Sequence, residues 1–150
     1  MIKKILVPID GSETARKALK YAVDMAKQTG SPIILLSVID KSPFYGAQTI
    51  PSVATPTHLQ ENLEDYLSQI AETYVEEAEG LCRINGVKSQ KIIKTGHPVE
   101  VIIKAAEKSK VDLIVMGSHG KSALGAALLG SVTSGVMHRE TKVPVLVVRR

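Results

Sequence analysis

The sequence is poor in cysteine and in aromatic residues, and both shortages narrow what the chain can do. Its one cysteine, Cys82, excludes an intramolecular disulfide framework, so we expect a cytoplasmic protein in which Cys82 is a buried structural thiol. Aromatic residues make up 3% of the chain, too few for a platform that stacks single-stranded bases. No apolar run is long enough to span a membrane, and Pro8 and Asp10 interrupt the first one before it resembles a signal peptide. We therefore expect neither nucleic acid nor a membrane as a partner.

The remaining composition is that of an ordinary globular protein. The chain has 150 residues, of which 44% are hydrophobic and 23% charged, and this length fits one domain over residues 1–150. The net charge is +4, but it is unevenly spread. Acidic residues gather in one stretch without Lys or Arg, which indicates solvated helix faces: Glu61, Glu64, Asp65, Glu72, Glu76, Glu77 and Glu79.

Strand and helix patterns alternate along the chain, which predicts an α/β fold with helices on both faces of a parallel sheet. The apolar runs predict strands over residues 4–9, 33–39, 88–94, 111–116 and 143–148. Helical periodicity predicts a helix from Ser12 to Gly30, an acidic helix from Leu59 until Asn85-Gly86, a helix opened by Gly96-His97-Pro98, and a last helix opened by Gly130. The segment from Asp40 to Thr57 carries four prolines and glycines and is predicted to be an irregular contact loop or lid.

Two turns of this pattern have the residues of a ligand site. Asp10-Gly11-Ser12 follows the first strand, and Gly117-Ser118-His119-Gly120 follows the fourth. If the strand order reverses between these two strands, both turns lie at the crevice where open α/β sheets bind ligands. Nine residues separate Gly120 from Gly130. Gly130 is followed by Ser131, Val132 and Thr133, which form the start of a predicted helix whose unpaired amides attract anions. The pattern favours phosphate as the ligand.

Other known chemistries lack their motifs here. The sequence has no Walker A motif, no G-x-G-x-x-G, no G-x-S-x-G and no His/Cys cluster with metal-ligand spacing. The plain alternatives stay open: the glycines as turn and capping residues, Asp10 as an Asx-turn residue, Ser131 and Thr133 as helix caps, His119 and Lys121 as solvated loop residues.

One spacing pattern resembles the G-2x-G-9x-G-[ST] motif of the ATP-binding branch of the universal stress protein family. It consists of Gly117-x-x-Gly120, nine further residues and then Gly130-Ser131. Residues 5–12 also resemble that family's first strand and turn, and residues 143–149 its last strand. The resemblance implies a Rossmann-like fold of the adenine nucleotide alpha hydrolase-like type, with a five-stranded parallel sheet in the order 3-2-1-4-5. It also implies a homodimer that pairs the fifth strands, about Val145 to Val148.

Position by position, the resemblance implies a site for ATP, with Mg²⁺. Pro8, Asp10 and the backbone of Val38 would flank the adenine and ribose, and Met116 and Gly117 would lie beside the nucleotide. Gly120 and Gly130 would admit the phosphates, which Ser131, Val132 and Thr133 would bind through N–H and hydroxyl groups.

Three functions are compatible with this sequence. The first is a dimeric binding module that holds ATP and passes a stress signal to a protein partner that the sequence does not identify. The second is a slow ATP hydrolase or self-modifying phosphoryl-transfer enzyme, for which Asp10, His119 and Lys121 are the groups near the motif. The third is a dimeric scaffold without nucleotide, against which the intact glycine motif counts. We expect the first and assign no catalytic residue.

Overall fold

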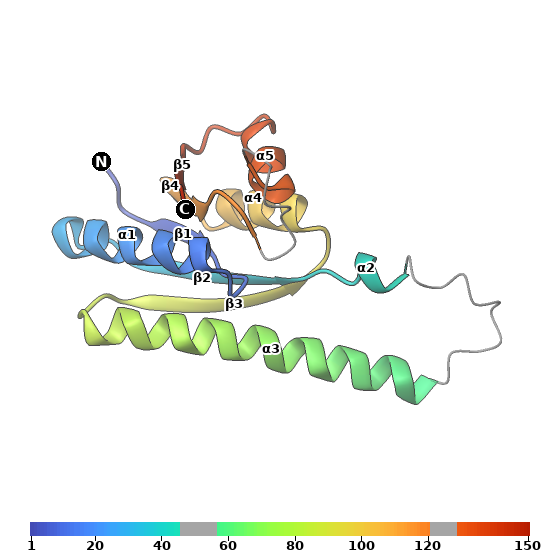
Figure 1. Cartoon of the computed structure of the whole chain (residues 1–150). Helices are drawn as coiled ribbons and strands as arrows, with labels where there is room; N and C mark the ends of the chain where they lie inside the picture. Colours follow the sequence, from blue (N-terminus) through green and yellow to red (C-terminus); the bar gives the residue numbers. More distant parts are fainter. Residues whose placement is uncertain (46–56, 121–128) are drawn as a thin grey trace.

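The computed structural model describes residues 1–45, 57–120 and 129–150. Strands and helices alternate in these segments, as Figure 1 shows along the colour ramp. Part of the predicted loop between Asp40 and Thr57, residues 46–56, lies outside the described residues, and so does Lys121. The elements in chain order are β1 (Ile5–Pro8), α1 (Glu13–Thr29), β2 (Ile33–Ile39), α2 (Ser42–Tyr45), α3 (Thr57–Ile84), β3 (Ser89–Thr95), α4 (Pro98–Lys108), β4 (Leu113–Gly117), α5 (Ser131–Met137) and β5 (Val145–Val148).

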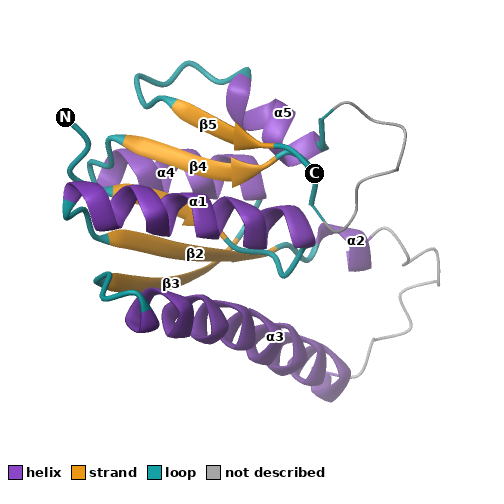
Figure 2. Cartoon of the chain, turned by 60° about the vertical axis from the view of Figure 1, so that its left-hand side comes forward, coloured by secondary structure: helices purple, strands orange, loops and turns teal. Residues whose placement is uncertain are grey.

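The five strands form one sheet in the order β3-β2-β1-β4-β5, and the pairings in it are all parallel. The central strand is β1, where Ile5 lies opposite Ile33 of β2 on one side and Leu113 of β4 on the other. The strand order reverses between β1 and β4, which confirms the predicted α/β fold class and strand order. Figure 2 shows the arrowheads of β4 and β5 at one end of the sheet, and because β1 and β4 pair in parallel, the turns after β1 and β4 share that end.

Helices cover both faces of the sheet because successive side chains of β1 point to opposite sides. Ile5 and Val7 pack in one apolar cluster with residues of α1 and α3, including Leu19 and Val75. Leu6 packs in the other cluster with residues of α4 and α5, including Ile102 and Val136. Burying one such side chain stabilises the fold by about 1.5–3 kcal/mol, so these two layers hold the strand ends in place.

Helix α1 begins and ends at residues that the sequence marks. The Oγ atom of Ser12 accepts a hydrogen bond from the amide of Ala15 at 3.2 Å, which caps the first turn. At the other end Gly30 takes a left-handed conformation with φ of 74°, and its amide donates to the Ala26 carbonyl at 2.8 Å. These caps fix where the chain leaves β1 and where it enters β2.

Some predicted boundaries were wrong. The first strand is shorter than residues 4–9, and β4 and β5 begin at Leu113 and Val145, later than the apolar runs suggest. Pro144, which has no amide hydrogen, lies just before β5 instead of inside it. Asp40 and Ser42 also start a short helix, α2, within the predicted irregular loop: Oδ1 of Asp40 accepts from the Ser42 amide at 3.0 Å.

The two edges of the sheet differ in character. Edge strand β3 carries the exposed side chains of Lys91 and Lys94, and Lys91 pairs with Glu79 of α3 at 3.5 Å. Edge strand β5 consists of four half-buried apolar residues. Within the described segments, no helix is both long enough and apolar enough to cross a membrane. The thiol of Cys82 is fully buried in the cluster beneath α1 and α3, as predicted.

Candidate functional site

The turn after β1 is held by its own side chains. Oδ1 of Asp10 accepts a hydrogen bond from the Ser12 amide at 2.9 Å, which makes the Asx turn that the sequence allows. Gly11 between them has φ of 78°, a left-handed conformation that L-residues with a side chain rarely adopt. Ser12 then caps α1. The turn therefore has a fixed shape and presents Asp10 at the carboxyl end of β1.

The turn after β4 is tied both to β5 and to the start of α5. The Ser118 amide donates to the Val148 carbonyl at 2.8 Å, and the Gly130 amide donates to the Ser118 carbonyl at 2.7 Å. The hydroxyl of Thr133 donates to the Gly117 carbonyl at 2.7 Å. The amide of Gly130 and the hydroxyl hydrogen of Thr133 thus serve the fold by bringing the beginning of α5 back onto the end of β4.

These two turns meet. A Cβ atom added to Gly120 would lie 2.7 Å from Oδ2 of Asp10, closer than real Cβ contacts come. The hydroxyl of Thr14, the second residue of α1, donates to the His119 carbonyl. A Cβ on Gly117 would lie 2.5 Å from the Oγ1 atom of Thr14. The glycines of the motif are therefore required by close approach between the two turns, in addition to any ligand.

Helix α5 begins at Ser131, directly after its N-cap Gly130, and its first residues lie at the same region. Gly130 has extended backbone geometry and no side chain caps the helix. The amides of Ser131, Val132 and Thr133 have no acceptor within the helix, because the first turn of a helix leaves its N–H groups unpaired. A Cβ on Gly130 would lie 3.2 Å from Cα of His119 and 3.3 Å from the Gly120 amide nitrogen. Gly130 is thus pressed against the turn after β4.

A cavity of about 280 Å³ lies where these pieces meet. Every residue that the sequence assigned to the site lines it: Pro8, Asp10, Val38, Met116, Gly117, Gly120, Gly130, Ser131, Val132 and Thr133. The structure therefore brings together residues from β1, β2, β4 and α5. Such a concave site with apolar walls and a few polar groups is typical of small-molecule binding.

Sequence reasoning did not assign several other residues of this cavity: Ile9, Ser12, Ala15, Leu36, Asp40, Pro43, Pro98, Ile102 and His119. Asp40 and Pro98 follow β2 and β3, so the rule that ligands bind at carboxyl strand ends would have found them. His119 is half-buried, not a solvated loop residue, and its Nδ1 atom lies 2.8 Å from Oγ of Ser118. Leu36 and Ile102 belong to the apolar cluster that packs against α4 and α5. The sequence pattern does not distinguish apolar residues that face a cavity from those packed inside such a cluster.

Residues 1–149 match the universal stress protein family, which is nearly the whole chain. The chain belongs to this family. Among its relatives, universal stress protein MJ0577 of Methanocaldococcus jannaschii is 39% identical over 157 residues, which cover 100% of this chain and 96% of that protein. Universal stress protein YxiE of Bacillus subtilis is 33% identical over 149 residues, covering 99% of this chain and 100% of that protein.

Solved structures of universal stress proteins have the same fold. The structure of MJ0577 superposes with a TM-score of 0.85 and covers 100% of this chain and 97% of that chain. A universal stress protein family member from Arabidopsis thaliana, solved with AMP bound, superposes with a TM-score of 0.68 at 20% identity, covering 98% of this chain and 92% of that chain. The second likeness concerns the fold alone.

Proposed function

We propose that this universal stress protein binds ATP, with Mg²⁺, in the cavity between the turns after β1 and β4. The observation that carries the proposal is the convergence of Asp10, Gly120 and the start of α5 on one cavity. Unpaired amides at a helix start suit phosphate oxygens, and the glycines let a phosphate approach the backbone closely. In the AMP-bound Arabidopsis structure this fold holds an adenine nucleotide.

The lining of the cavity supports a division of roles. Pro8, Met116 and the backbone of Val38 would lie beside the adenine and ribose, since all three residues line the cavity. Asp10 offers carboxylate oxygens to the ribose hydroxyls, since ionised carboxylates accept hydrogen bonds. The phosphates would then lie over Gly120 and Gly130, with the amides of Ser131 to Thr133 as donors.

The donor set also bears on Mg²⁺. Among the described residues, no three His, Cys, Asp or Glu side chains are grouped so that they could hold a metal ion. Mg²⁺ is commonly held through one or two carboxylates, water and the phosphates of its substrate. Asp10 and Asp40, the carboxylates that line the cavity, fit that arrangement, in which the ion arrives with the nucleotide.

Nucleotide binding is tested by a glycine pair. We expect wild-type protein to release an adenine nucleotide on denaturation, seen by mass spectrometry, or to bind ATP in calorimetry. Gly130→Val should lower ATP affinity by about tenfold or more, because its side chain would push into the backbone of His119 and Gly120. Gly80→Val is the matched control, since nothing lies within 4 Å of a Cβ there. Unchanged affinity in folded Gly130→Val would overturn the assigned phosphate site.

A slow ATP hydrolase is the second candidate, because Asp10 and His119 line the same cavity. General base catalysis needs a group within hydrogen-bond reach of the attacking water. Steady multiple-turnover release of phosphate by purified protein, lost in Asp10→Ala, would establish the enzyme. Binding without such release establishes the module.

We propose further that the protein acts as a homodimer in the cytoplasm, paired through β5. The four apolar residues of this edge strand are half-buried in the single chain, and an open apolar strand edge favours pairing with another strand. The cytoplasmic assignment rests on the single cysteine of the sequence.

A further inference from the structure

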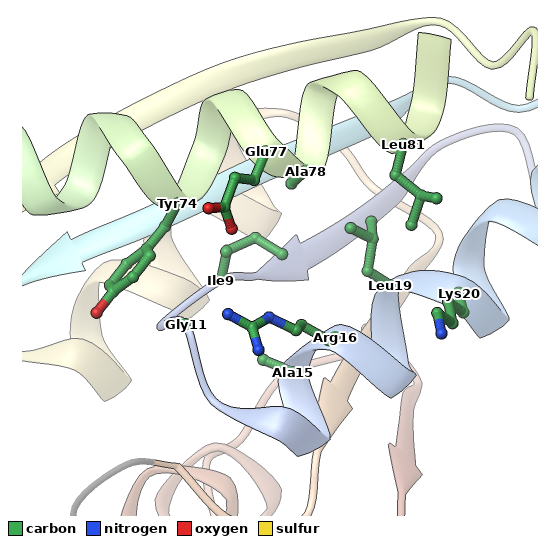
Figure 3. A pocket seen from close by; sticks show the side chains of 10 residues that line it. All are labelled: Ile9, Gly11, Ala15, Arg16, Leu19, Lys20, Tyr74, Glu77, Ala78 and Leu81. Carbon is green, nitrogen blue, oxygen red and sulfur yellow. The ribbon is translucent and has the colours of Figure 1, made fainter. Parts of the chain in front are cut away.

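The turn after β1 is contacted from its outer side by a tyrosine of α3. Tyr74 is half-buried, and its ring lies against Gly11: an added Cβ there would be 2.4 Å from Cε1 and Cζ of Tyr74. Figure 3 shows the ring projecting from α3 beside this turn. Gly11 is therefore needed both for its left-handed conformation and for the space that the ring occupies.

The inner side of the same turn faces the proposed nucleotide cavity. Asp10 lines that cavity, and its two oxygens hold the Ser12 amide and face Gly120. The turn is thus enclosed between the Tyr74 ring on one side and the turn after β4 on the other. Tyr74 itself is not among the residues described as lining the nucleotide cavity.

The packing around this contact is incomplete. A second cavity, of about 180 Å³, lies between α1 and α3, where Tyr74, Gly11, Arg16 and Leu81 are among its lining residues (Figure 3). Ile9 and Ala15 line this cavity and the nucleotide cavity alike, so the two are separated by the β1–α1 segment. Removing the ring would enlarge an existing void next to the turn, which lets the turn move outward.

We propose that Tyr74 is a positioning residue for the nucleotide cavity: its ring holds the Asp10–Ser12 turn against Gly120. This inference rests on the proposed function for its binding readout. Two ring carbons and the hydroxyl oxygen of Tyr74 all lie within 3 Å of the place that a Gly11 Cβ would take, so the contact with the turn is one of shape. A phenylalanine at this position preserves the ring carbons of that contact.

The test compares four proteins in ATP calorimetry. Tyr74→Ala should weaken ATP binding about tenfold, a coupling of the size that packed side chains transmit between neighbouring sites. Tyr74→Phe, which keeps the ring carbons at Gly11, should bind ATP more tightly than Tyr74→Ala. Val75→Ala, which truncates a side chain 2% exposed in the same core cluster, should destabilise the fold and leave affinity unchanged. Equal losses in Tyr74→Ala and Tyr74→Phe, or in Tyr74→Ala and Val75→Ala, would overturn the positioning role.

A second readout needs no ligand. In nucleotide-free protein, hydrogen exchange at the Ser12 amide, which is bonded to Asp10, should be about tenfold faster in Tyr74→Ala than in Tyr74→Phe. An unchanged exchange rate of the Ser12 amide in Tyr74→Ala would refute the proposal that the ring of Tyr74 keeps the Asp10–Ser12 turn in place. If wild-type protein binds no adenine nucleotide, the proposed function fails, and the exchange rates alone decide whether Tyr74 positions the turn.

Discussion

The hydroxyl of Thr14 donates a hydrogen bond to the backbone carbonyl of His119, and this bond links α1 to the turn after β4. Thr14 is buried, with 6% of its surface exposed. The contact joins segments that are far apart in sequence and sets how closely the two turns that form the proposed nucleotide cavity approach each other. Its loss should affect both stability and binding.

Thr14→Val removes this donor while keeping a side chain of similar size. We expect the free energy of unfolding in urea titrations to fall by about 0.5–1.5 kcal/mol, the usual net contribution of an intramolecular hydrogen bond. Thr73→Val is the control, because the Thr73 hydroxyl also donates to a backbone carbonyl, that of Gln69, but on an exposed helix face. That change should stay within about 0.5 kcal/mol. Equal losses of unfolding free energy in the two variants would mean that the hydrogen bond to His119 stabilises the fold no more than an exposed one does.

Alanine substitutions at two glycines should change stability in opposite directions. Gly117→Ala places a Cβ 2.7 Å from the backbone carbon of Thr14, so overpacking should destabilise the protein by about 1–3 kcal/mol. Gly80→Ala lies within α3 with open space around it, and should stabilise the protein by about 0.5–1 kcal/mol through helix propensity. Denaturation midpoints that move in the same direction would contradict the close approach of β4 and α1.

Stability should decline at alkaline pH through Cys82. Burial raises the pKa of this thiol above its ordinary value of 9.0, a Ser89 hydrogen bond opposes the rise, and the Glu79 charge adds to it. The unfolded chain therefore releases the proton at lower pH than the native protein does. The stability that the neutral thiol contributes is complete below 9.0 and is lost as pH rises toward the native pKa. Urea unfolding across this range should show a smaller decline for Cys82→Ala; equal declines would exclude Cys82 as the cause.

The proposed dimer is tested at the open edge of β5. The Pro144 carbonyl accepts a hydrogen bond from Ile114 of β4 and the Val148 carbonyl accepts one from Ser118, just after β4. The backbone groups of Val145 and Val147, which alternate with them, therefore point to the open edge. Val147→Pro removes one amide from that edge and should shift the protein from dimer to monomer in sedimentation velocity. ATP affinity should persist, since Val147 is not among the cavity residues. A dimer that survives this change is paired elsewhere.

Local sequence pattern was enough to predict the order of strands and helices. Period-two and apolar runs mark strands, and the caps at Ser12 and Gly30 mark α1, because these features depend on neighbours in the sequence. The boundaries of β4 and β5 were less predictable, since an apolar residue such as Val111 or Val143 packs in the core without pairing in the sheet. Helix α2 depends on the hydrogen bond from the Ser42 amide to the Asp40 side chain, which the helix propensities of these residues do not predict.

The glycine motif and the family resemblance together placed the candidate residues of the cavity, but the contacts that shape it could not be predicted. Nothing in the sequence pairs Thr14 with His119, or Tyr74 with Gly11, because these contacts depend on how α1 and α3 pack against the sheet. The helical period of the sequence puts Tyr74 on the apolar face of its helix but does not show what its ring contacts. The glycines showed where close approach occurs without showing which side chain approaches.

The unlike edges of the sheet limit how far self-association can go. Strand β3 carries Lys91 and Lys94, whose charges would oppose a second copy of this strand, whereas β5 offers an uncharged row from Val145 to Val148. Once two β5 strands have joined, each end of the enlarged sheet is a β3 strand. In the proposed dimer, this arrangement would disfavour growth into an open filament, so the assembly would stop at two copies.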